Sequence, residues 1–481
     1  MDWIESHIKT LTVLSGMSEE TARKLFLQPV RIEFAPDVWE NATYKLAYVV
    51  AVNLVARVFP RVDFEPGNFA WALTPWGKFE PIYKGDERAR VVLRIGTDAN
   101  AAEEIGLVLH NWRVALNATR PADPTESWNP MLAIIGACYA VSAITNKLLN
   151  GAINGAKVWP EFSILDFESG EADFDFNAQI EFGEVHVAGI GAVGSAFLYC
   201  LLAHGKLRGR LHLVDKDVID TTNLGRYTLF DTSDLENRKV DAAKAKLAPI
   251  SGMDCEAHFD EFQSYCQHQL KEDPGFRIVG LVSAPDKRKT RRLFQHELPR
   301  RLWDASTGPD QVVIHSNDYD PSFACLECIY PERPEEDAHL RHLSETLGVP
   351  LEELRLQTTI SPENAARITS RYPQLKIEQL VGRDYDSIFR DLCSASMLRA
   401  GDEVVLAPMS FTSMLAGAFL YLEFLKSLRS VSFTHLKPVN YYVLNPHFPP
   451  NPYLRELRRS RPTCTCQTSV YRRAFSRIWG V

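Results

Sequence analysis

The stretch that decides the fold is EVHVAGIGAVGSAFLYCLLAHGKLRGRLHLVD, residues 184–215. Its apolar pattern predicts a buried strand over 185–188, a helix over 192–204 and a second strand over 210–214, which Asp215 closes. The turn after the first strand carries three glycines at the spacing G-x-G-x-x-G: Gly189, Gly191 and Gly194. A strand, this turn and a helix in sequence predict a Rossmann-like, doubly wound α/β domain.

A glycine-rich turn at the start of a helix is suited to bind a phosphate. Without side chains the backbone can approach a pyrophosphate, and the free N–H groups and dipole of the helix N-terminus favour an anion. Asp215 has the position of the acidic residue that binds a nucleotide ribose. These residues alone are compatible with an NAD-dependent oxidoreductase.

Length and composition describe a globular protein of more than one domain. The chain has 481 residues, 45% of them hydrophobic and 24% charged, with a formal net charge of −8. This acidic balance argues against a general nucleic-acid binder. We find neither an uninterrupted apolar run of membrane-spanning length nor a secretory signal pattern, so we expect a cytoplasmic protein with no membrane partner. In that compartment the nine cysteines are expected to be ligands, nucleophiles or core residues rather than disulfides.

Helical and strand patterns on both sides of this stretch predict a second domain. The predicted parts are an N-terminal α/β domain over 1–160, a linker over 161–183 and the Rossmann-like domain over 184–481. The alternative for the acidic and aromatic linker segment is an edge hairpin. Charged, weakly periodic residues over 332–400 predict a helical crossover insertion. Further predicted elements are helices over 41–59, 130–149, 287–295 and 408–428, and strands over 90–95, 278–282 and 301–307.

Two of the apolar helices resemble each other. NPMLAIIGACYAVSAITNKLLNG (residues 129–151) and APMSFTSMLAGAFLYLEFLKSLR (residues 407–429) share a Pro-Met start, a central Gly-Ala and a Lys-Leu or Lys-Ser-Leu end. Either these are two unrelated core helices, or residues 1–155 are a degenerate copy of the second domain.

The sequence after the second strand narrows the class of protein to which the chain can be compared. It reads LVDKDVIDTTNLGRYTLFDTSDLENRKVDAAKAKL, residues 213–247. This stretch resembles the ThiF/MoeB superfamily of activating enzymes, whose pattern is Asp-x-Asp-x-Val, then Asn-Leu-x-Arg, then a Lys thirteen residues after that Arg. The matching residues are Asp215, Asp217, Asn223, Leu224, Arg226 and Lys239. The resemblance extends from about residue 184 to residue 467.

The resemblance implies ATP-dependent adenylation of a carboxylate. In that reaction the carboxylate attacks the α-phosphorus and pyrophosphate leaves, so negative charge grows on phosphate oxygens that preorganised cations stabilise. Arg226 and Lys239 are suited to this role, and Asn223 can hydrogen-bond a phosphate. The alternative is that both cations are ordinary surface residues.

The superfamily also has a pattern Asp-Asn-x-x-x-Arg, whose Asp helps to hold Mg²⁺. Asp286 and Arg291 match it, while Lys287 replaces the Asn and Ser283 replaces an acidic residue often found three positions earlier. The resemblance therefore assigns Asp286 to magnesium. The alternative is a turn residue at the end of a strand.

Two cysteine pairs predict a structural zinc site. Cys325 and Cys328 form a CxxC followed by an aromatic residue and proline, and Cys464 and Cys466 form a CxC near the C-terminus. Four thiolates make a closed tetrahedral Zn²⁺ site. The superfamily pairs such a CxxC with a second pair, usually also CxxC. The alternative is four core cysteines.

Cys393 lies alone near the end of the predicted insertion, before the last long helix. Superfamily members that form a thioester with their partner carry the nucleophilic cysteine at this place. Arg390 and Arg399 are close in sequence and favour the thiolate, which is the reactive form. The alternative is a buried cysteine. The remaining cysteines have no motif and are interpreted as structural: Cys138, Cys200, Cys255 and Cys266.

Within the superfamily, the architecture is most similar to the activating enzymes of bacterial Bil-type antiphage operons. This implies a ubiquitin-like β-grasp partner with a C-terminal glycine, the cofactors ATP, Mg²⁺ and Zn²⁺, and transfer to a conjugating enzyme. Many members are homodimers in which an arginine of one subunit reaches the other's ATP. A degenerate, inactive N-terminal domain could supply that arginine within one chain, and Arg23 and Arg31 are the candidates.

Three other functions compete with this one. Activation of a sulphur carrier, as in thiamin, molybdopterin or tRNA thiolation, uses the same adenylation. An NAD-dependent oxidoreductase explains the glycines and Asp215, but it does not explain Arg226, Lys239 or the cysteine pairs. A regulatory subunit of an activating heterodimer usually loses the glycine turn and the cations, which this chain keeps.

Overall fold

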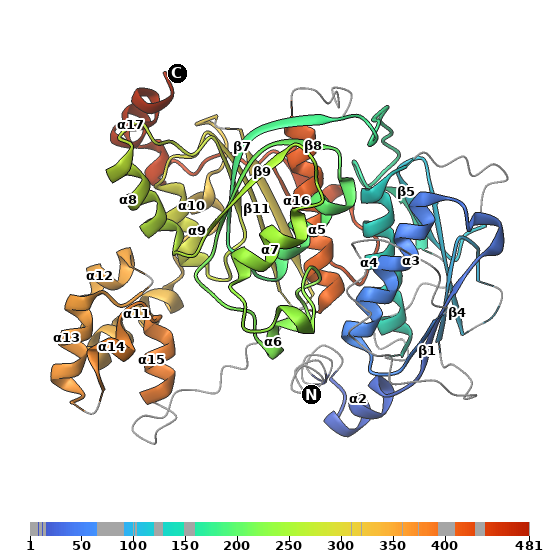
Figure 1. Ribbon diagram of the computed structural model, residues 1–481, viewed down its shortest axis with the longest axis horizontal. Coiled ribbons are helices and arrows are strands. Elements are labelled where there is room, and N and C mark those ends of the chain that lie inside the picture. Colours follow the sequence, from blue (N-terminus) through green and yellow to red (C-terminus); the bar gives the residue numbers. More distant parts are fainter. Residues whose placement is uncertain are drawn as a thin grey trace.

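The computed structural model describes residues 16–64, 91–119, 128–148, 159–392, 409–428 and 438–480, apart from residues 100, 102, 309, 319, 358 and 374, together with residues 8 and 12. It contains two α/β halves, each built on its own sheet, with helices of both halves packed between the sheets (Figure 1). The predicted α/β fold class is confirmed.

The C-terminal half contains the Rossmann-like sheet, in the strand order β14-β13-β12-β11-β10-β7-β8-β9. Strands β9, β8, β7, β10 and β11 are parallel, and β12, β13 and β14 continue the sheet antiparallel. The strands are β7 (Ile180–Ala188), β8 (Leu207–Val214), β9 (Met253–His258), β10 (Gly280–Ser283), β11 (Arg301–Thr307), β12 (Val312–Asn317), β13 (Tyr441–Leu444) and β14 (Arg455–Glu456). The helices outside the insertion are α5 (Ala192–His204), α6 (Thr221–Leu224), α7 (Lys239–Leu247), α8 (Phe262–Glu272), α9 (Arg288–Gln295), α10 (Leu326–Ile329), α16 (Ser410–Ser427) and α17 (Ser469–Trp479). In such a sheet, ligands bind outside the carboxyl ends of the parallel strands.

The N-terminal half repeats part of this topology, in the strand order β2-β1-β3-β4-β5-β6. Four strands are parallel, and β5 and β6 are antiparallel. The elements are α2 (Glu19–Phe26), β1 (Val30–Phe34), α3 (Ala42–Val58), β2 (Val62–Phe64), β3 (Val91–Ile95), β4 (Glu104–His110), β5 (Arg113–Leu116), α4 (Pro130–Leu148) and β6 (Trp159–Ser163). In both halves an antiparallel hairpin is followed by a long apolar helix, α4 or α16, and then by the next antiparallel strand. The two helices that resemble each other in sequence therefore hold equivalent places.

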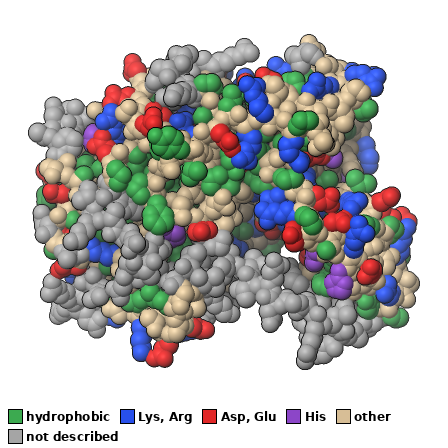
Figure 2. Space-filling view, turned by 180° about the vertical axis from the view of Figure 1, so that it is seen from behind, with side chains coloured by type: hydrophobic (Ala, Val, Ile, Leu, Met, Phe, Trp, Pro, Cys, Tyr) green, Lys and Arg blue, Asp and Glu red, His purple; other side chains and the backbone are tan. Residues whose placement is uncertain are grey.

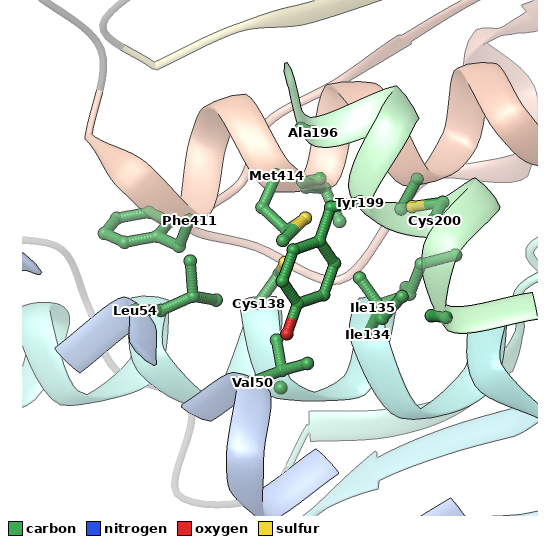
Figure 3. Close-up of a cluster of buried hydrophobic side chains, with 14 of the residues drawn as sticks. Val50, Leu54, Ile134, Ile135, Cys138, Ala196, Tyr199, Cys200, Phe411 and Met414 are labelled. Carbon is green, nitrogen blue, oxygen red and sulfur yellow. The ribbon is translucent and has the colours of Figure 1, made fainter. Parts of the chain in front are cut away.

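Four helices form a shared layer between the two sheets. Helix α16 packs on α5 and α4, and α3 packs on α4. Figure 3 shows Tyr199 of α5 surrounded by side chains of the other three helices, among them Val50 of α3, Cys138 of α4 and Met414 of α16. A Cβ at Gly417 of α16 would lie 2.4 Å from the Cβ of Ala196 on α5, so this glycine permits the close approach of the two helices. The halves therefore share one hydrophobic core.

Residues 334–392 form a separate helical lobe, as the sequence predicted for the insertion. Its helices are α11 (Pro334–Leu347), α12 (Leu351–Leu356), α13 (Pro362–Arg371), α14 (Ile377–Leu380) and α15 (Tyr385–Leu392). They enclose a small hydrophobic cluster of their own, which includes Leu343, Leu354 and Ile368. The lobe stands apart from the sheets in Figure 1, and Figure 2 shows acidic and basic side chains interspersed on its surface.

The predicted elements are present, with bounds that differ by a few residues. The largest difference is β7, which begins at Ile180 and not at residue 185. Ile180 and Phe182 are buried while Glu181 is exposed, so the strand starts as an alternating pattern inside an acidic and aromatic stretch that hid it. Residues 161–163 belong to β6 and residues 180–183 to β7, so the segment predicted as a linker is partly sheet.

Helix α4 is long and apolar enough to cross a membrane by length and composition alone. Within this structure 89% of its most apolar window is buried. The core helix of a globular protein passes the same test, and the packing of α4 in the shared helix layer accounts for its composition.

Candidate active site

The glycine turn after β7 leaves the start of helix α5 open. Gly189 has φ +92°, and a Cβ there would lie 2.9 Å from the carbonyl oxygen of Ala284 at the end of β10. A Cβ at Gly194 would lie 2.0 Å from the carbonyl oxygen of Gly189, so only glycine fits. Gly191 is the N-cap of α5 and offers no side chain to its N–H groups. The helix start can therefore receive an anion, as the sequence predicts.

Asp215 at the end of β8 fixes this turn. Its carboxylate accepts hydrogen bonds from the backbone N–H of Ile190 at 2.6 Å and of Asp217 at 2.8 Å. Burial raises the pKa of Asp215, while Lys239 and the two backbone donors act in the opposite direction. The side chain that we assigned to a ribose thus already shapes the phosphate turn.

Lys239 at the start of α7 is directed to the same place. Its Nζ lies 2.7 Å from Asp217 Oδ2 and 3.4 Å from the hydroxyl of Tyr227, and only 5% of its side chain is exposed. Burial lowers the pKa of Lys239, but the charges of Asp215, Tyr227 and Asp217 outweigh burial and raise the pKa above its ordinary value. A Cβ at Gly191 would lie 3.7 Å from the Tyr227 hydroxyl, so the protonated amine lies near the open helix start.

The segment 221–230, here called the α6 loop, carries the other two predicted phosphate ligands. Asn223 is 7% exposed, and its Oδ1 accepts from the backbone N–H of Asp220 at 3.2 Å. Arg226 is half-buried, with its guanidinium 5.9 Å from the centre of the Tyr227 ring. Within the described part of the chain no ion pair engages Arg226. Its charge is thus available to a ligand.

Tyr227, which lies beside both cations, was not predicted as a site residue. Its ring centre is 5.2 Å from Lys239 Nζ, and its hydroxyl is hydrogen-bonded to the same amine. An aromatic ring beside cations adds cation–π attraction and fixes their direction. The signal was its position directly after Arg226, the last residue of the Asn-Leu-x-Arg motif.

The exit of β10 completes the edge of the site. Asp286 is exposed there, two residues after Ala284, which contacts the glycine turn. Arg291 does not pair directly with it. The Arg291 guanidinium is buried, donates to Asp304 and to the carbonyl of Pro285, and so holds the backbone beside Asp286. Asp304 also accepts from Ser283 and Tyr330 at 2.6 Å each.

Lys287, where the family pattern has Asn, connects this edge to the helical lobe. Its Nζ lies 2.6 Å from Asp384 and 2.7 Å from Asp386, at the start of α15. Burial lowers the pKa of Lys287, but both aspartates outweigh burial and raise it. The basic helix α9 adds a second contact through Arg288, which pairs with Glu336 of α11 at 2.8 Å. The substitution thus exchanges a polar residue for an ion pair with the lobe that precedes Cys393.

Four cysteines come together as the sequence predicts. Their Sγ atoms lie within 4.8 Å of one another, and all four side chains are buried: Cys325, Cys328, Cys464 and Cys466. Three of the Sγ–Sγ distances are 3.6, 3.8 and 3.8 Å. Zn–S bonds of about 2.3 Å in a tetrahedron require separations of about 3.8 Å. The donor set therefore fits a structural zinc ion, and CxC spacing in the second pair is compatible with it.

Other ligand-type groups lie on β7, β8 and β9. Glu184, His186 and His212 form one set, and His212 with Glu256 and His258 forms another. The His186 and His212 rings are stacked, with centroids 4.4 Å apart, under Tyr265 of α8. Burial lowers the pKa of His186 to about 2, with His212 and His258 contributing, so its imidazole is neutral and packs in the core.

The remaining predicted residues are distributed as follows. Cys393 lies outside the described residues. Cys138, Cys200 and Cys266 are buried, and burial raises the pKa of each thiol; Cys255 is half-buried, with a pKa raised to about 11 by burial.

The two arginines proposed to reach ATP lie in the N-terminal half. Arg31 on β1 pairs with Asp63 of β2 at 2.8 Å, and Arg23 pairs with Glu19 within α2 at 3.2 Å. A different arginine of this half, Arg57 of α3, reaches the α6 loop: it donates to the backbone carbonyls of Leu224 and Phe230.

An open helix start, a buried lysine, an uncommitted arginine and an exposed carboxylate at the carboxyl edge of a parallel sheet define a nucleotide-binding α/β protein equipped for phosphate chemistry. Residues 168–468 match the ThiF family. This match covers more than half of the 481 residues, and the chain belongs to the ThiF family. It is thus an adenylyltransferase of the kind that activates ubiquitin-like or sulphur-carrier proteins, which uses ATP and Mg²⁺.

Two curated proteins and one solved structure are similar to the chain. The uncharacterized protein y4jF of Sinorhizobium fredii is 26% identical over 94% of this chain and 92% of its own length. The adenylyltransferase and sulfurtransferase MOCS3 of Drosophila yakuba is 27% identical over 34% of this chain, which spans about a third (36%) of that relative. A solved structure of PaaA is 13% identical, with a TM-score of 0.33 over 55% of this chain and 69% of that one.

Proposed function

We propose that the protein activates the C-terminal glycine carboxylate of a ubiquitin-like β-grasp protein by adenylation, with release of pyrophosphate. The observation that carries this proposal is the open start of α5 next to the Tyr227 hydroxyl, with the buried Lys239 and Arg226 both beside the Tyr227 ring. The ring of Tyr227 orders both cations before a ligand arrives. Preorganised cations of this kind stabilise the charge that develops during transfer to a phosphorus atom.

Each residue of the site has a distinct role in this proposal. The N–H groups at the start of α5 bind phosphate oxygens, and Lys239, Arg226 and Asn223 bind the oxygens on which charge grows. Asp286 is the exposed carboxylate suited to Mg²⁺, which prefers oxygen ligands. ATP supplies the phosphorus that accepts the carboxylate and the pyrophosphate that leaves. Asp215 keeps the glycine turn in its binding shape.

The zinc ion has a structural role in the proposal. Cys464 and Cys466 connect the C-terminal segment to Cys325 and Cys328, which follow the antiparallel strand β12. A fully thiolate-ligated zinc leaves no open position for a substrate. It would therefore fasten α17 and the segment before it to the sheet.

The second step is transfer of the activated acyl group to the Cys393 thiol. Cys393 directly follows α15, the helix that Lys287 ties to the edge of the site. The thiolate attacks the acyl carbon, a C–S bond forms, the C–O bond to phosphate breaks and AMP leaves. The thioester would then pass to a conjugating enzyme in the cytoplasm. The resemblance to Bil-type operons supports a role in bacterial antiphage conjugation.

Sulphur-carrier activation is the second candidate. The similarity to the adenylyltransferase and sulfurtransferase MOCS3 supports it, over 34% of this chain. Both candidates share the adenylation step and differ at the thioester.

A non-reducing gel distinguishes the two. The protein is incubated with ATP, Mg²⁺ and the small β-grasp protein encoded nearest to its gene, alongside Cys393→Ala and the matched control Cys255→Ala. We expect a thiol-sensitive adduct that Cys393→Ala abolishes and Cys255→Ala retains. Pyrophosphate exchange without an adduct would favour the sulphur-carrier candidate, and absence of exchange with every β-grasp protein tried would contradict adenylation of this substrate class.

A further inference from the structure

Helix α3 of the N-terminal half carries a polar pair inside an apolar face. Asn53 and Arg57 interrupt the otherwise apolar run from Leu46 to Val58, and they lie one helical turn apart. Both side chains are buried, with exposed fractions of 1% and 0%. Buried arginine is rare in proteins unless a partner requires its charge or its hydrogen bonds.

The partner of this pair is the α6 loop of the other half. Arg57 Nη1 donates to the carbonyl of Leu224, and Nη2 donates to the carbonyl of Phe230 at 2.7 Å. Asn53 donates to the carbonyl of Thr228 at 3.3 Å and accepts from Arg57 Nε at 2.7 Å. Two side chains of one half thus hold three backbone carbonyls of a loop that contains Arg226 and begins two residues before Asn223.

Arg57 remains charged although its side chain is buried. Burial lowers the pKa of Arg57 to about 10, while Tyr199, Asp231 and Asp234 act to raise it. The guanidinium is therefore protonated at neutral pH and keeps its planar set of donors. Hydrogen bonds from a charged donor in a buried site are stronger than neutral ones, and a loop whose carbonyls at residues 224 and 230 are bound by one rigid group has little freedom.

The other helices of the layer fix the position of α3 relative to the α6 loop. Figure 3 shows Val50 and Leu54 of α3 against Tyr199 of α5, and Ser410 of α16 donates to the carbonyl of Leu54 at 3.2 Å. Asn53 also hydrogen-bonds Tyr199. The position of α3 is thus set by α5, which follows the glycine turn, and by α16, which packs on the C-terminal sheet.

We propose that Arg57 is a positioning residue for nucleotide binding: it holds the α6 loop in the conformation that presents Asn223 and Arg226 to the phosphates. This inference rests on the proposed function, because it takes the α6 loop as part of the ATP site. It gives the N-terminal half a task within the active site of the other half. Arg57 acts through backbone carbonyls and does not itself contact the nucleotide.

The test measures nucleotide binding without any protein partner. The dissociation constant of the Mg²⁺ complex of a non-hydrolysable ATP analogue is measured by calorimetry for the full chain and for Arg57→Met, which keeps the apolar stem and removes the donors. We expect binding to weaken by about 10- to 100-fold, since small displacements of positioning groups have effects of this size. Arg57→Lys, which keeps the charge but not the two-pronged donor, should lie between the two.

The control separates positioning from general stability. Val50→Ala removes apolar packing from the same helix layer and should lower the melting temperature while leaving the dissociation constant unchanged. Hydrogen exchange should rise in residues 221–230 of Arg57→Met and stay unchanged in α5. If Arg57→Met does not fold, Asn53→Ala and Arg57→Lys are measured by the same two readouts.

The outcomes are distinguishable. Wild-type affinity in folded Arg57→Met, or an equal loss of affinity in Val50→Ala, overturns the positioning role. Failure of the unaltered protein to bind the analogue overturns the proposed function and not this inference alone.

Discussion

The starts of helices α3 and α5 are the sharpest contrast between the two halves. Both helices follow the first strand of their half. At α3, the side chain of Asn41 accepts from the backbone N–H groups of Thr43 and Tyr44 at 2.9 and 3.2 Å. At α5, the N-cap is Gly191, and among the described residues no side-chain cap is present. One helix start is closed by its own sequence, and the other is open to an anion.

This difference indicates that two halves of similar topology have different roles, since only one of the two compared helix starts is open to a ligand. The connection after β1, residues 35–41, reads APDVWEN and has no glycine that would let a phosphate approach. The N-terminal half instead contributes α3 and α4 to the shared helix layer and donates from Arg57 to the α6 loop. Both observations are compatible with the prediction that the N-terminal half is a degenerate copy of the other half.

Removal of the metal is expected to have the largest effect, because the two halves also differ in their cysteine ligands. Of the nine cysteines, Cys138 is the one within the first 160 residues, so a cysteine-ligated metal is expected in the C-terminal half alone. We expect one zinc per chain, lost in Cys464→Ser and retained in Cys255→Ser. Because binding of a structural zinc adds its free energy to folding, its loss should lower the melting temperature by about 5 °C or more. Elemental analysis and calorimetry measure both, and protein without zinc but with unchanged stability would contradict this role.

Lys239 tests whether the open helix start is the catalytic one. Lys239→Met keeps the stem of the side chain and removes the buried charge, and should reduce pyrophosphate exchange by about 100- to 1,000-fold, as for other groups that stabilise developing charge. The matched control is Lys246→Met on the same helix, whose Nζ pairs with Asp231 at 2.9 Å and Asp234 at 3.1 Å. It should affect stability more than exchange. Equal losses in both variants would show that Lys239 only supports the fold.

Exchanging the caps tests the contrast directly. Gly191→Asn gives α5 the cap that α3 has, and the site has room, because the nearest atom to a Cβ would be 3.7 Å away. The Asn side chain should then occupy the first N–H groups and weaken binding of the ATP analogue by about tenfold or more, while the melting temperature stays unchanged or rises. The reciprocal Asn41→Ala should cost about 1 kcal/mol of stability and leave nucleotide binding unchanged. Unchanged affinity in Gly191→Asn would refute the open-start assignment.

The contact between the halves should also depend on pH. His447 is 3% exposed and contacts Ser142 and Asn146 of α4, and burial lowers its pKa to about 4 from the ordinary 6.5. The unfolded chain binds this proton more readily, so the stability contributed by neutral His447 is present above pH 6.5 and falls as the pH drops toward about 4. The full loss corresponds to about 3 kcal/mol at most. His447→Gln should flatten the stability profile between these values relative to the exposed control His268→Gln, measured by denaturant unfolding; identical slopes would exclude His447 as the cause.

Some features were predictable from the sequence because they depend on local patterns. Gly189 and Gly194 are required because neighbouring backbone atoms leave no room for a Cβ. The four cysteines are recognisable as metal ligands by residue type, whatever their separation along the chain. The apolar periodicity of α3, α4 and α16 placed those helices to within about two residues at each end. The motif from Asp215 to Lys239 indicated the reaction class, because its residues gather around one turn.

Other features arose only when distant segments met. Arg57 and Leu224 lie 167 residues apart, and Lys287 and Asp384 lie 97 apart. No local pattern encodes such a contact, and Asn53 and Arg57 were not predicted to have a role. The start of β7 was missed for a related reason: its first residues become a strand because β8 is present to pair with them.

The sequence by itself determined the glycine turn, the positions of Arg226 and Lys239 in the family motif and the cysteine set, because each depends on residue type and on spacing within a short motif. Only the tertiary structure decided that the N-terminal half shares a helix layer with the other half and donates from Arg57 to the α6 loop. The physical reason is that burial and a hydrogen bond to a distant carbonyl are properties of packed surfaces, and these exist only once both sheets have formed.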